Sequence, residues 1–495
     1  MVMVFSMAAT VFAEGDITTY SITVPAVAAG EAAHTYEVYQ IFTGTISDGK
    51  LVDVKWGKNG TGTEGKTVAD TTIAELEAVA EKSDSEKLAA ITTYADLTGS
   101  AYGEVESGNT LSGVPSGYYL IKDKDDSLNG AVGAYTTYIV KVVNDVTVSP
   151  KSAKPTVDKQ VDDNDDKAAE GDNNGWGETA DHAINETFQF KLTATLTTDT
   201  DYDAYKTYKV VFTDTMSDGV TFENIVSVTV EGVTVDNYTC TATEGQKGGS
   251  WTLTIADIKA YKGVNLTDGA IVEVIYNAHL NESASVNSSD GGTKNKNTVK
   301  LDYSNNPNAG GDGELGTTPE DHVWVFTYEV DNTKYKDAVE EENVLAGAGF
   351  TLYDSDKKEV ELYLKDDVYY VYDVKLGNTV TKITKMTSQS NGTFNIKGLD
   401  VGTYTLEETT VPAGYNKCEP IKVVITATHE ETTDGASATT TLTSSLNMTN
   451  SIVNKSGTVL PETGGMGTTI FYAAGAILVL GAGILLVTKR RMRAK

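Results

Sequence analysis

Segments that alternate apolar and polar side chains with a period of two recur along most of the chain. They include FQFKLTATL, YKVVFTDT, WTLTIADI and AIVEVIYNAHL. Such alternation predicts strands that place one face on a core and the other in water. Clusters rich in glycine, asparagine and serine separate these segments and predict turns. The pattern therefore predicts an all-β fold, built as tandem immunoglobulin-like β-sandwich domains.

One stretch departs from this pattern and predicts a short helix near the N-terminus. Between Thr72 and Ile91 the apolar side chains have helical spacing. The predicted apolar face consists of Ile73, Leu76, Val79 and Ala80. We therefore expect one short helix in an N-terminal domain that is otherwise made of strands.

The C-terminal segment predicts a membrane anchor. Residues 470–487 carry no charge, and their number is close to the roughly 20 residues that a helix needs to cross a bilayer. Basic residues follow directly and predict a cytoplasmic tail by the positive-inside rule. They are Lys489, Arg490, Arg491, Arg493 and Lys495. The sequence thus predicts one C-terminal transmembrane helix, with the long segment before it outside the cell.

The first residues predict export. Residues 1–13 are mostly apolar and end in Val11-Phe12-Ala13, a small-x-small pattern typical of signal-peptidase cleavage. No basic residue precedes the apolar run, so we expect the true start to lie upstream of Met1. Residues 1–13 are therefore interpreted as an incomplete signal peptide.

Composition restricts the possible functions. The formal net charge of −31 argues against nucleic acid as a partner. The chain has two cysteines, Cys240 and Cys418, and five scattered histidines without metal-ligand spacing. It also lacks the sequence patterns of a phosphate-binding loop or a G-x-S-x-G nucleophile. We therefore expect no enzyme activity, no cofactor and no metal.

Changes in composition mark the expected domain boundaries. Proline and lysine cluster at 149–155, and a run rich in asparagine and glycine spans 306–321. Three extracellular domains of ordinary size follow from these boundaries, each near the range of ~100–150 residues. The predicted domains are 14–150, 151–318 and 319–455, followed by the C-terminal signal and anchor at 456–495.

The pentapeptide before the apolar span resembles the LPxTG cell-wall sorting signal of Gram-positive bacteria. It consists of Leu460, Pro461, Glu462, Thr463 and Gly464. The resemblance implies that a sortase attacks the carbonyl of Thr463, releases Gly464 and passes the acyl group to an amine through a thioester. A residue before proline avoids the helical region, so Leu460 and Pro461 are expected to present an extended segment.

A candidate amine lies at the first domain boundary. The segment VTVSPKSAKP resembles the pilin motif of sortase-assembled backbone pilins, with Lys151 as the acceptor. The family motif usually reads Tyr-Pro-Lys-Asn, whereas this chain has serine at both flanking positions, 149 and 152. Lys154 is the competing acceptor, and a solvated linker lysine is the alternative interpretation of Lys151.

The third predicted domain resembles the Cna protein B-type domain, a small β-sandwich of Gram-positive surface proteins. The resemblance rests on VLAGAGFTLYDSD and NGTFNIKGLDVGTYTLEETTVPAGYN. Within it, YTLEETTVPAGY is similar to the pilin E-box, with Glu408 as its glutamate. Strand alternation places Glu408 on the face of Tyr404 and Leu406, and turns Glu407 to the opposite face. A carboxyl on an apolar face is costly unless it is protonated or paired.

In this family the buried carboxyl promotes an amide bond between a lysine and an asparagine of the same domain. Burial favours the neutral amine and the neutral acid, which are the forms that the reaction needs. For the third domain the resemblance implies Lys334 and Asn454, with Lys336 and Asn450 as alternates. For the second domain it implies Lys159, Asp214 and Asn297, with a turn-forming role as the alternative for Asp214. We assign no such bond to the first domain.

The resemblance implies a major structural subunit of a covalently polymerised, cell-wall-anchored pilus that supports adhesion and colonisation. The alternative is a wall-anchored monomeric adhesin or a minor pilin at the tip or base. The implied partners are pilus-specific and housekeeping sortases, other copies of the same chain, minor pilins, peptidoglycan, and host or bacterial surface ligands. The expected location is the cell-wall pilus, with a precursor in the plasma membrane.

Overall fold

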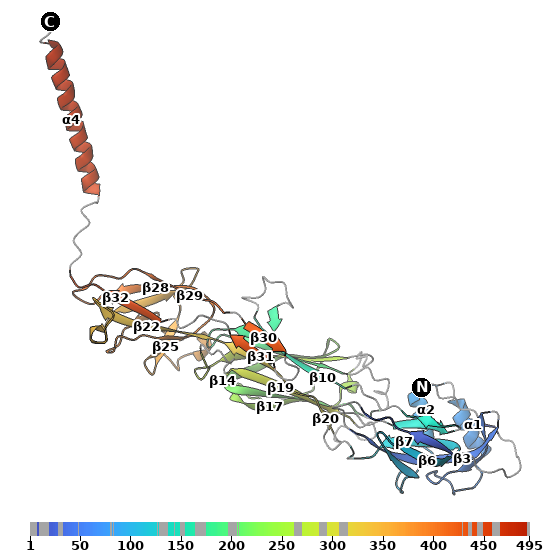
Figure 1. The fold of residues 1–495 in the computed structure, drawn as a ribbon. Coiled ribbons are helices and arrows are strands. Elements are labelled where there is room, and N and C mark those ends of the chain that lie inside the picture. The colour runs from blue at the N-terminus through green and yellow to red at the C-terminus, as the bar shows by residue number, and fades with distance from the viewer. Residues whose placement is uncertain are drawn as a thin grey trace.

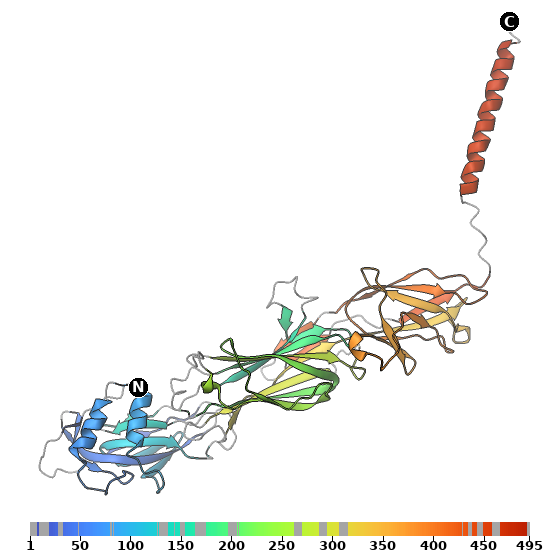
Figure 2. The same cartoon turned by 180° about the vertical axis from the view of Figure 1, so that it is seen from behind.

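The computed structural model places three β-rich regions one after another along a long axis, and helix α4 projects beyond the third (Figure 1). The view from behind shows the same order (Figure 2). We refer to the N-terminal, middle and C-terminal regions. The structure describes residues 7–8, 19–27, 33–47, 49–79, 82, 84–125, 127, 137–142, 144–148, 154–163, 175–196, 205, 207–261, 270–286, 295–305, 315–427, 429–433, 438–442, 449–457 and 466–492.

The N-terminal region combines two sheets with two helices. One sheet has the order β1-β4-β3-β7-β8, with β5 also paired to β3, and the other has the order β6-β2-β9. One apolar core lies against the helices and a second core joins the two sheets. The elements are β1 (Met7–Ala8), β2 (Thr19–Thr23), β3 (Thr35–Ser47), β4 (Lys50–Trp56), α1 (Asp70–Ala78), α2 (Asp84–Thr92), β5 (Gly103–Glu106), β6 (Thr110–Pro115), β7 (Gly117–Asp123), β8 (Thr137–Val142) and β9 (Val146–Thr147).

The single helix predicted for 72–91 is wrong, because the structure has two shorter helices there. Helix α1 ends at Ala78, and α2 begins at Asp84. Ile73 and Leu76 are buried as predicted, Val79 is half-buried after the helix end, and Ala80 lies outside the described residues. Residues 81–86 are all polar and offer no apolar side chain to the core. Because serine and aspartate favour helix ends over helix interiors, the helix breaks at this point.

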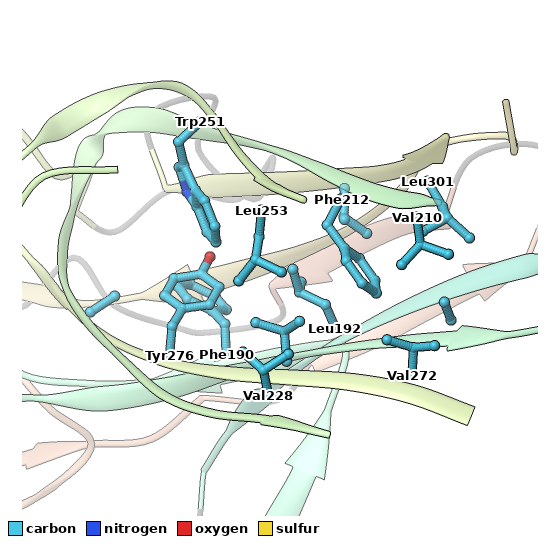
Figure 3. Close-up of a cluster of buried hydrophobic side chains, with 14 of the residues drawn as sticks. Phe190, Leu192, Val210, Phe212, Val228, Trp251, Leu253, Val272, Tyr276 and Leu301 are labelled. Carbon is cyan, nitrogen blue, oxygen red and sulfur yellow. The ribbon is translucent and has the colours of Figure 1, made fainter. Parts of the chain in front are cut away.

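The middle region is organised around one long strand, β14 (Val210–Val230). Its first half pairs with β17 and β19, and its second half pairs with β18 after a register shift. The other elements are β10 (Thr156–Asp162), β11 (Trp176–Gly177), β12 (Thr179–Asp181), β13 (Phe188–Thr195), β15 (Val233–Thr234), β16 (Thr239–Cys240), β17 (Lys247–Ile255), η3 (Ile258–Ala260), β18 (Ile271–Leu280), β19 (Lys296–Ser304), β20 (Leu315–Thr317) and β21 (Asp321–Phe326). Their inward faces form one large apolar core, part of which Figure 3 shows.

The C-terminal region is a sandwich of two sheets, with the orders β24-β25-β27-β22-β32 and β26-β23-β28-β29. A single apolar core contains side chains from both sheets. Its elements are β22 (Tyr328–Lys336), η4 (Glu341–Asn343), β23 (Gly349–Tyr353), β24 (Leu362–Lys365), β25 (Val368–Val371), η5 (Val374–Leu376), β26 (Lys385–Thr387), β27 (Ile396–Leu399), β28 (Gly402–Thr410), β29 (Ile421–Ile425), β30 (His429–Thr433), β31 (Ala438–Leu442) and β32 (Thr449–Asn454).

Helix α4 (Met466–Met492) contains the predicted apolar span. The segment from Tyr472 to Arg490 is apolar and long enough to cross a membrane, and none of it packs against the rest of the chain. The sandwich architecture and the single C-terminal apolar helix confirm the predicted fold class. The boundary predicted at 318 falls just before β21, which pairs with β12 and β19 of the middle region.

Candidate functional site

Two clusters of buried polar side chains lie inside the apolar cores, one in the middle region and one in the C-terminal region. The middle cluster consists of Lys159, Asp214, Tyr276 and Asn297, all of them 0% exposed. The C-terminal cluster consists of Lys334, Glu408 and Asn454, of which none is more than 1% exposed. Since buried charged groups are rare unless paired, each cluster requires an explanation beyond packing.

Strand alternation brings the middle cluster into the core. On β10, Lys159 points inward with Val161, and its backbone N–H donates to Asp321 Oδ2 at 2.6 Å. Asp214 follows Val210 and Phe212 on the inner face of β14, so it lies within the strand rather than directly after it as predicted. A turn-forming role for Asp214 is therefore wrong. Asn297 is the second residue of β19 and pairs in register with Met216 of β14.

Tyr276 connects the other three members of the middle cluster. Its hydroxyl group lies 2.6 Å from Asn297 Nδ2, 3.0 Å from Asp214 Oδ2 and 3.3 Å from Lys159 Nζ. The Lys159 ammonium also contacts Asp214 Oδ2 directly. Asp214 Oδ1 and Asn297 Oδ1 are buried without a hydrogen-bond partner among the described residues. The cluster is therefore a connected network with two unsatisfied acceptors.

Burial controls the protonation of the middle cluster. It lowers the pKa of Lys159 and raises the pKa of Asp214, although the attraction between the two groups opposes both changes. Burial also raises the pKa of Tyr276 far above its ordinary value, so the phenol keeps its proton. The aromatic rings of Phe190 and Tyr276 surround Lys159 Nζ, with ring centres 4.9 and 5.3 Å away. This environment favours the uncharged amine and the uncharged acid.

The C-terminal cluster joins the first and last strands of its region. Strands β22 and β32 run parallel and pair, with Lys334 opposite Ile452 and Lys336 opposite Asn454. Lys334 Nζ donates to Asn454 Oδ1 at 2.6 Å. Glu408, on β28, reaches in from the opposite sheet. The lysine amine therefore lies beside the asparagine side chain that it is predicted to attack.

Glu408 contacts both reaction partners in this cluster. Its Oε1 accepts a hydrogen bond from Asn454 Nδ2 at 2.7 Å and lies 3.8 Å from Lys334 Nζ. Its Oε2 accepts from the backbone N–H of Cys418 at 2.9 Å. Burial lowers the pKa of Lys334, with Cys418 and Glu408 opposing the change. Phe350 covers the amine, with its ring centre 5.4 Å from Nζ.

The alternates named from the sequence lie elsewhere. Glu407 forms a half-exposed ion pair with Lys417 at 2.7 Å. Asn450 donates to Asn332 at 3.0 Å rather than approaching a lysine. Lys336 is half-buried two residues beyond Lys334 and outside the buried cluster. The structure thus brings together Lys334, Glu408 and Asn454, and it leaves the alternates apart from them.

Two residues of the clusters could not be identified from sequence. Tyr276 alternates with Val272 and Val274 along β18, and this pattern marks it only as a core residue. The backbone N–H of Cys418 belongs to the loop after the E-box, where no motif indicates a contact with Glu408. Both contacts depend on how strands far apart in sequence cross each other.

The predicted sortase residues cannot be placed in the same way. Lys151 and the pentapeptide 460–464 lie outside the described residues. Lys154, the competing acceptor, is half-buried just before β10. Within the part of the chain that the structure describes, no group of three or more histidine, cysteine, aspartate or glutamate side chains could hold a metal ion.

Sequence families match the C-terminal third of the chain. Residues 331–439 match the SpaA family, described as a prealbumin-like fold domain, and residues 452–492 match the LPXTG cell wall anchor motif. A search of curated proteins found no match. The chain therefore carries a prealbumin-like domain followed by a cell-wall anchor.

Solved structures of pilins share the overall fold. The T6 backbone pilin of serotype M6 Streptococcus pyogenes has a TM-score of 0.51 at 17% identity, over 90% of this chain and 100% of that chain. The full-length major pilin SpaD from Corynebacterium diphtheriae has a TM-score of 0.48 at 18% identity, over 89% and 98% of the two chains. With the anchor motif, the T6 fold confirms the resemblance to sortase-assembled backbone pilins. This chain is a cell-wall-anchored surface protein with a pilin fold.

Proposed function

We propose that the protein is the major structural subunit of a covalently polymerised, wall-anchored pilus. Sortase would join Thr463 of one subunit to Lys151 of the next, and two internal Lys–Asn isopeptide bonds would stabilise each subunit. The observation that carries this proposal is the pair of buried lysine–carboxyl–asparagine clusters in two successive β-rich regions. An ordinary adhesin fold has no need of this combination twice.

An amide explains the clusters better than a permanent ion pair does. Removing two charges from water costs several kcal/mol per ion in practice, and a buried pair regains this only with complete hydrogen bonding. The middle cluster lacks such completeness, because Asp214 Oδ1 and Asn297 Oδ1 have no partner among the described residues. A reaction that consumes the amine and leaves a neutral amide removes the buried positive charge.

The reaction balances within the chain. The neutral lysine Nζ attacks the asparagine Cγ, a new C–N bond forms, and the bond from Cγ to Nδ2 breaks with release of ammonia. The carboxyl receives a proton from the attacking amine and returns one to the leaving nitrogen. In the C-terminal cluster the attacking and attacked groups are already in contact, with Lys334 Nζ 2.6 Å from Asn454 Oδ1. Fixed proximity of this kind replaces the cost of bringing two reactants together.

The proposed bonds are large terms in the stability of each region. Lys334 and Asn454 are 120 positions apart, and Lys159 and Asn297 are separated by a similar distance in sequence. A cross-link that closes a loop of ~100 residues lowers the entropy of the unfolded chain by about 4.7 kcal/mol in the disulfide treatment. Whole domains are stable by only ~5–15 kcal/mol. Such bonds also supply durability where the described cysteines, Cys240 and Cys418, are both free.

The proposed joining points lie far apart on the long axis. Lys151 precedes β10, which follows the N-terminal region, whereas the LPETG segment follows β32 at the far end of the C-terminal region (Figure 1). Linkage between these points would add each subunit lengthwise. The domain division at 14–150, 151–318 and 319–455 fits this arrangement, with the acceptor lysine in the first linker.

The proposed protein is structural and not an enzyme, because each cluster would react once and on its own chain. Its partners would be a pilus-specific sortase for polymerisation, a housekeeping sortase for attachment to peptidoglycan, minor pilins, and surface ligands of host or bacterial cells. These assignments rest on the sorting signal and the pilin fold.

Two measurements test the proposal. The purified ectodomain should weigh less than its sequence mass by two ammonia molecules, and a mass equal to the sequence mass would exclude both bonds. Denaturing gels of cell-wall extracts should show a ladder of multimers, which Lys151→Ala abolishes and Lys154→Ala, the matched control, retains. A single wall-linked band in the wild type would indicate a monomeric adhesin instead.

A further inference from the structure

Tyr276 is the one member of the middle cluster that the proposed lysine–carboxyl–asparagine chemistry does not use. The three polar partners of its hydroxyl group are the three groups that the reaction changes. Its ring is fixed by aromatic neighbours, with Trp251 edge-on at 5.1 Å and Phe222 stacked at 5.6 Å between ring centres. Figure 3 shows the hydroxyl of Tyr276 directed towards Trp251 and away from the β18 backbone. The phenol is therefore held at one place among the reacting groups.

We propose that Tyr276 is a fourth catalytic residue of the middle cluster, carrying a proton between Asp214 and the leaving nitrogen of Asn297. This inference rests on the proposed isopeptide bond. The C-terminal cluster shows why a relay is needed. There, Glu408 Oε1 contacts Asn454 Nδ2 directly at 2.7 Å. In the middle cluster, the described contacts join Asp214 to Lys159 and Tyr276, and the Tyr276 hydroxyl makes the contact with Asn297 Nδ2.

The difference follows from side-chain length. Aspartate is one methylene shorter than glutamate, so a carboxyl mounted on a strand reaches less far into the core. The phenol spans the remaining distance with two hydrogen bonds, at 3.0 Å to Asp214 and 2.6 Å to Asn297. Asp214 with Tyr276 thus does the work that Glu408 does alone.

The direction of proton transfer changes during the reaction. Before attack, the amide nitrogen of Asn297 has no available lone pair, so it donates to the Tyr276 oxygen while the phenol donates to Asp214. When Lys159 Nζ bonds to Cγ, the nitrogen becomes an amine that can accept a proton. Tyr276 then gives its proton to Nδ2 and recovers one from Asp214, which has taken it from Lys159. Ammonia leaves, and both Tyr276 and Asp214 end as they began.

The chain offers an internal control because its two clusters differ in this one component. The full chain can be made by cell-free synthesis in detergent and sampled over time. Tryptic digestion and mass spectrometry then measure the Lys159–Asn297 and Lys334–Asn454 linked peptides in the same sample. Tyr276→Phe keeps the ring and removes the hydroxyl group. We expect it to slow the middle linkage by on the order of 100-fold or more, as for loss of a general acid, and to leave the C-terminal linkage unchanged.

The matched control is Tyr261→Phe, which removes a hydroxyl of the same region that donates to the backbone of Asn237 at 2.9 Å. It should leave both linkages at the wild-type rate. Equal middle rates in Tyr276→Phe and wild type would overturn the relay. Absence of the Lys159–Asn297 peptide from the wild type would instead overturn the proposed bond itself, so the two failures are distinguishable.

A second measurement covers the case in which Tyr276→Phe does not fold. Replacing all tyrosines by 3-fluorotyrosine keeps the rings and hydroxyl groups but makes each phenol more acidic. The middle linkage should change in rate relative to the C-terminal linkage, because the described contacts of the C-terminal cluster include no phenol. An unchanged ratio of the two rates would overturn the relay.

Discussion

The middle and C-terminal clusters place the same functional groups in the core through different strand arrangements. In the C-terminal region, Lys334 and Asn454 lie on β22 and β32, which are already paired as parallel neighbours. In the middle region, Lys159 lies on β10 and Asn297 on β19, and the sheet order places β13, β18 and β14 between these strands. A bond in the C-terminal region would reinforce an existing ladder. A bond in the middle region would instead connect strands that no ladder joins.

The clusters also differ in how the carboxyl is used. Glu408 has its other oxygen fixed by the backbone N–H of Cys418, which leaves Oε1 free to contact Asn454. Asp214 has no such backbone donor among the described contacts, and it is held by Lys159 and Tyr276 instead. The comparison teaches that strand position fixes which groups meet, whereas side-chain length decides whether the carboxyl needs a helper.

The largest expected effect comes from removing each carboxyl. Asp214→Ala and Glu408→Ala should each restore one ammonia to the mass, because no acid remains to move the proton. Each should lower the stability of its own region by about 5 kcal/mol, the value of a cross-link closing a loop of this length. Calorimetry and intact-mass measurements on the ectodomain would report both changes.

The two variants also test the difference in strand arrangement. Trypsin should cut the middle region of Asp214→Ala more readily than the C-terminal region of Glu408→Ala, because β22 and β32 stay paired without the bond. Glu407→Ala is the matched control, since its carboxyl is half-exposed and pairs with Lys417. Loss of both linkages in either single variant would contradict the separation of the clusters.

A smaller and more selective effect should follow from shortening the C-terminal carboxyl. Glu408→Asp withdraws the acid by one methylene from Asn454 Nδ2, now 2.7 Å away, and the described cluster contains no phenol to span the distance. We expect the Lys334–Asn454 linkage to form on the order of 10- to 100-fold more slowly, a fraction of a full general-acid effect. Timed digestion with mass spectrometry measures it. A wild-type rate would show that carboxyl length does not distinguish the two clusters.

The sequence could predict most of the fold and much of the clusters. Period-two alternation indicated the sandwiches, and it distinguished Glu408 from Glu407 because adjacent strand residues face opposite ways. The same logic put Lys159 with Val161 and Asp214 with Phe212. These features are local, so a pattern along one strand contains them.

The sequence could not predict features that depend on the crossing of distant elements. The phenol of Tyr276 meets Asp214 across 62 positions, and nothing in β18 distinguishes it from any other core tyrosine. The break between α1 and α2 was also missed, because apolar spacing on both sides of residues 81–86 suggested continuity across them. Asp214 was placed at a strand end because the following segment, SDGV, has the composition of a turn, whereas β14 continues through it.

The two cluster-bearing regions also contact each other, and this junction has its own polar network. Asn185 Nδ2 donates to the Val371 carbonyl at 2.8 Å. Glu223 of the middle region accepts hydrogen bonds from His279 at 2.7 Å and from Lys375 of the C-terminal region at 2.6 Å. Although burial of Glu223 acts in the opposite direction, these contacts lower its pKa from 4.5 to about 2. The junction therefore depends on an ionised carboxyl.

The smallest expected effect is a loosening of this junction in acid, which would show that the regions are coupled even though their clusters react separately. A carboxyl with a lowered pKa stabilises the folded state above its ordinary pKa, and this contribution is lost as the pH falls from 4.5 to about 2. Because Glu223 is partly exposed, we expect about 1 kcal/mol, or roughly 2–4 °C in thermal midpoint. Glu223→Gln removes the titrating group, so the wild type should exceed it at pH 5 and lose that advantage by pH 2. Other carboxyls titrate in both proteins and cancel in the difference. A difference that stays constant between pH 5 and pH 2 would mean that Glu223 does not hold the two regions together.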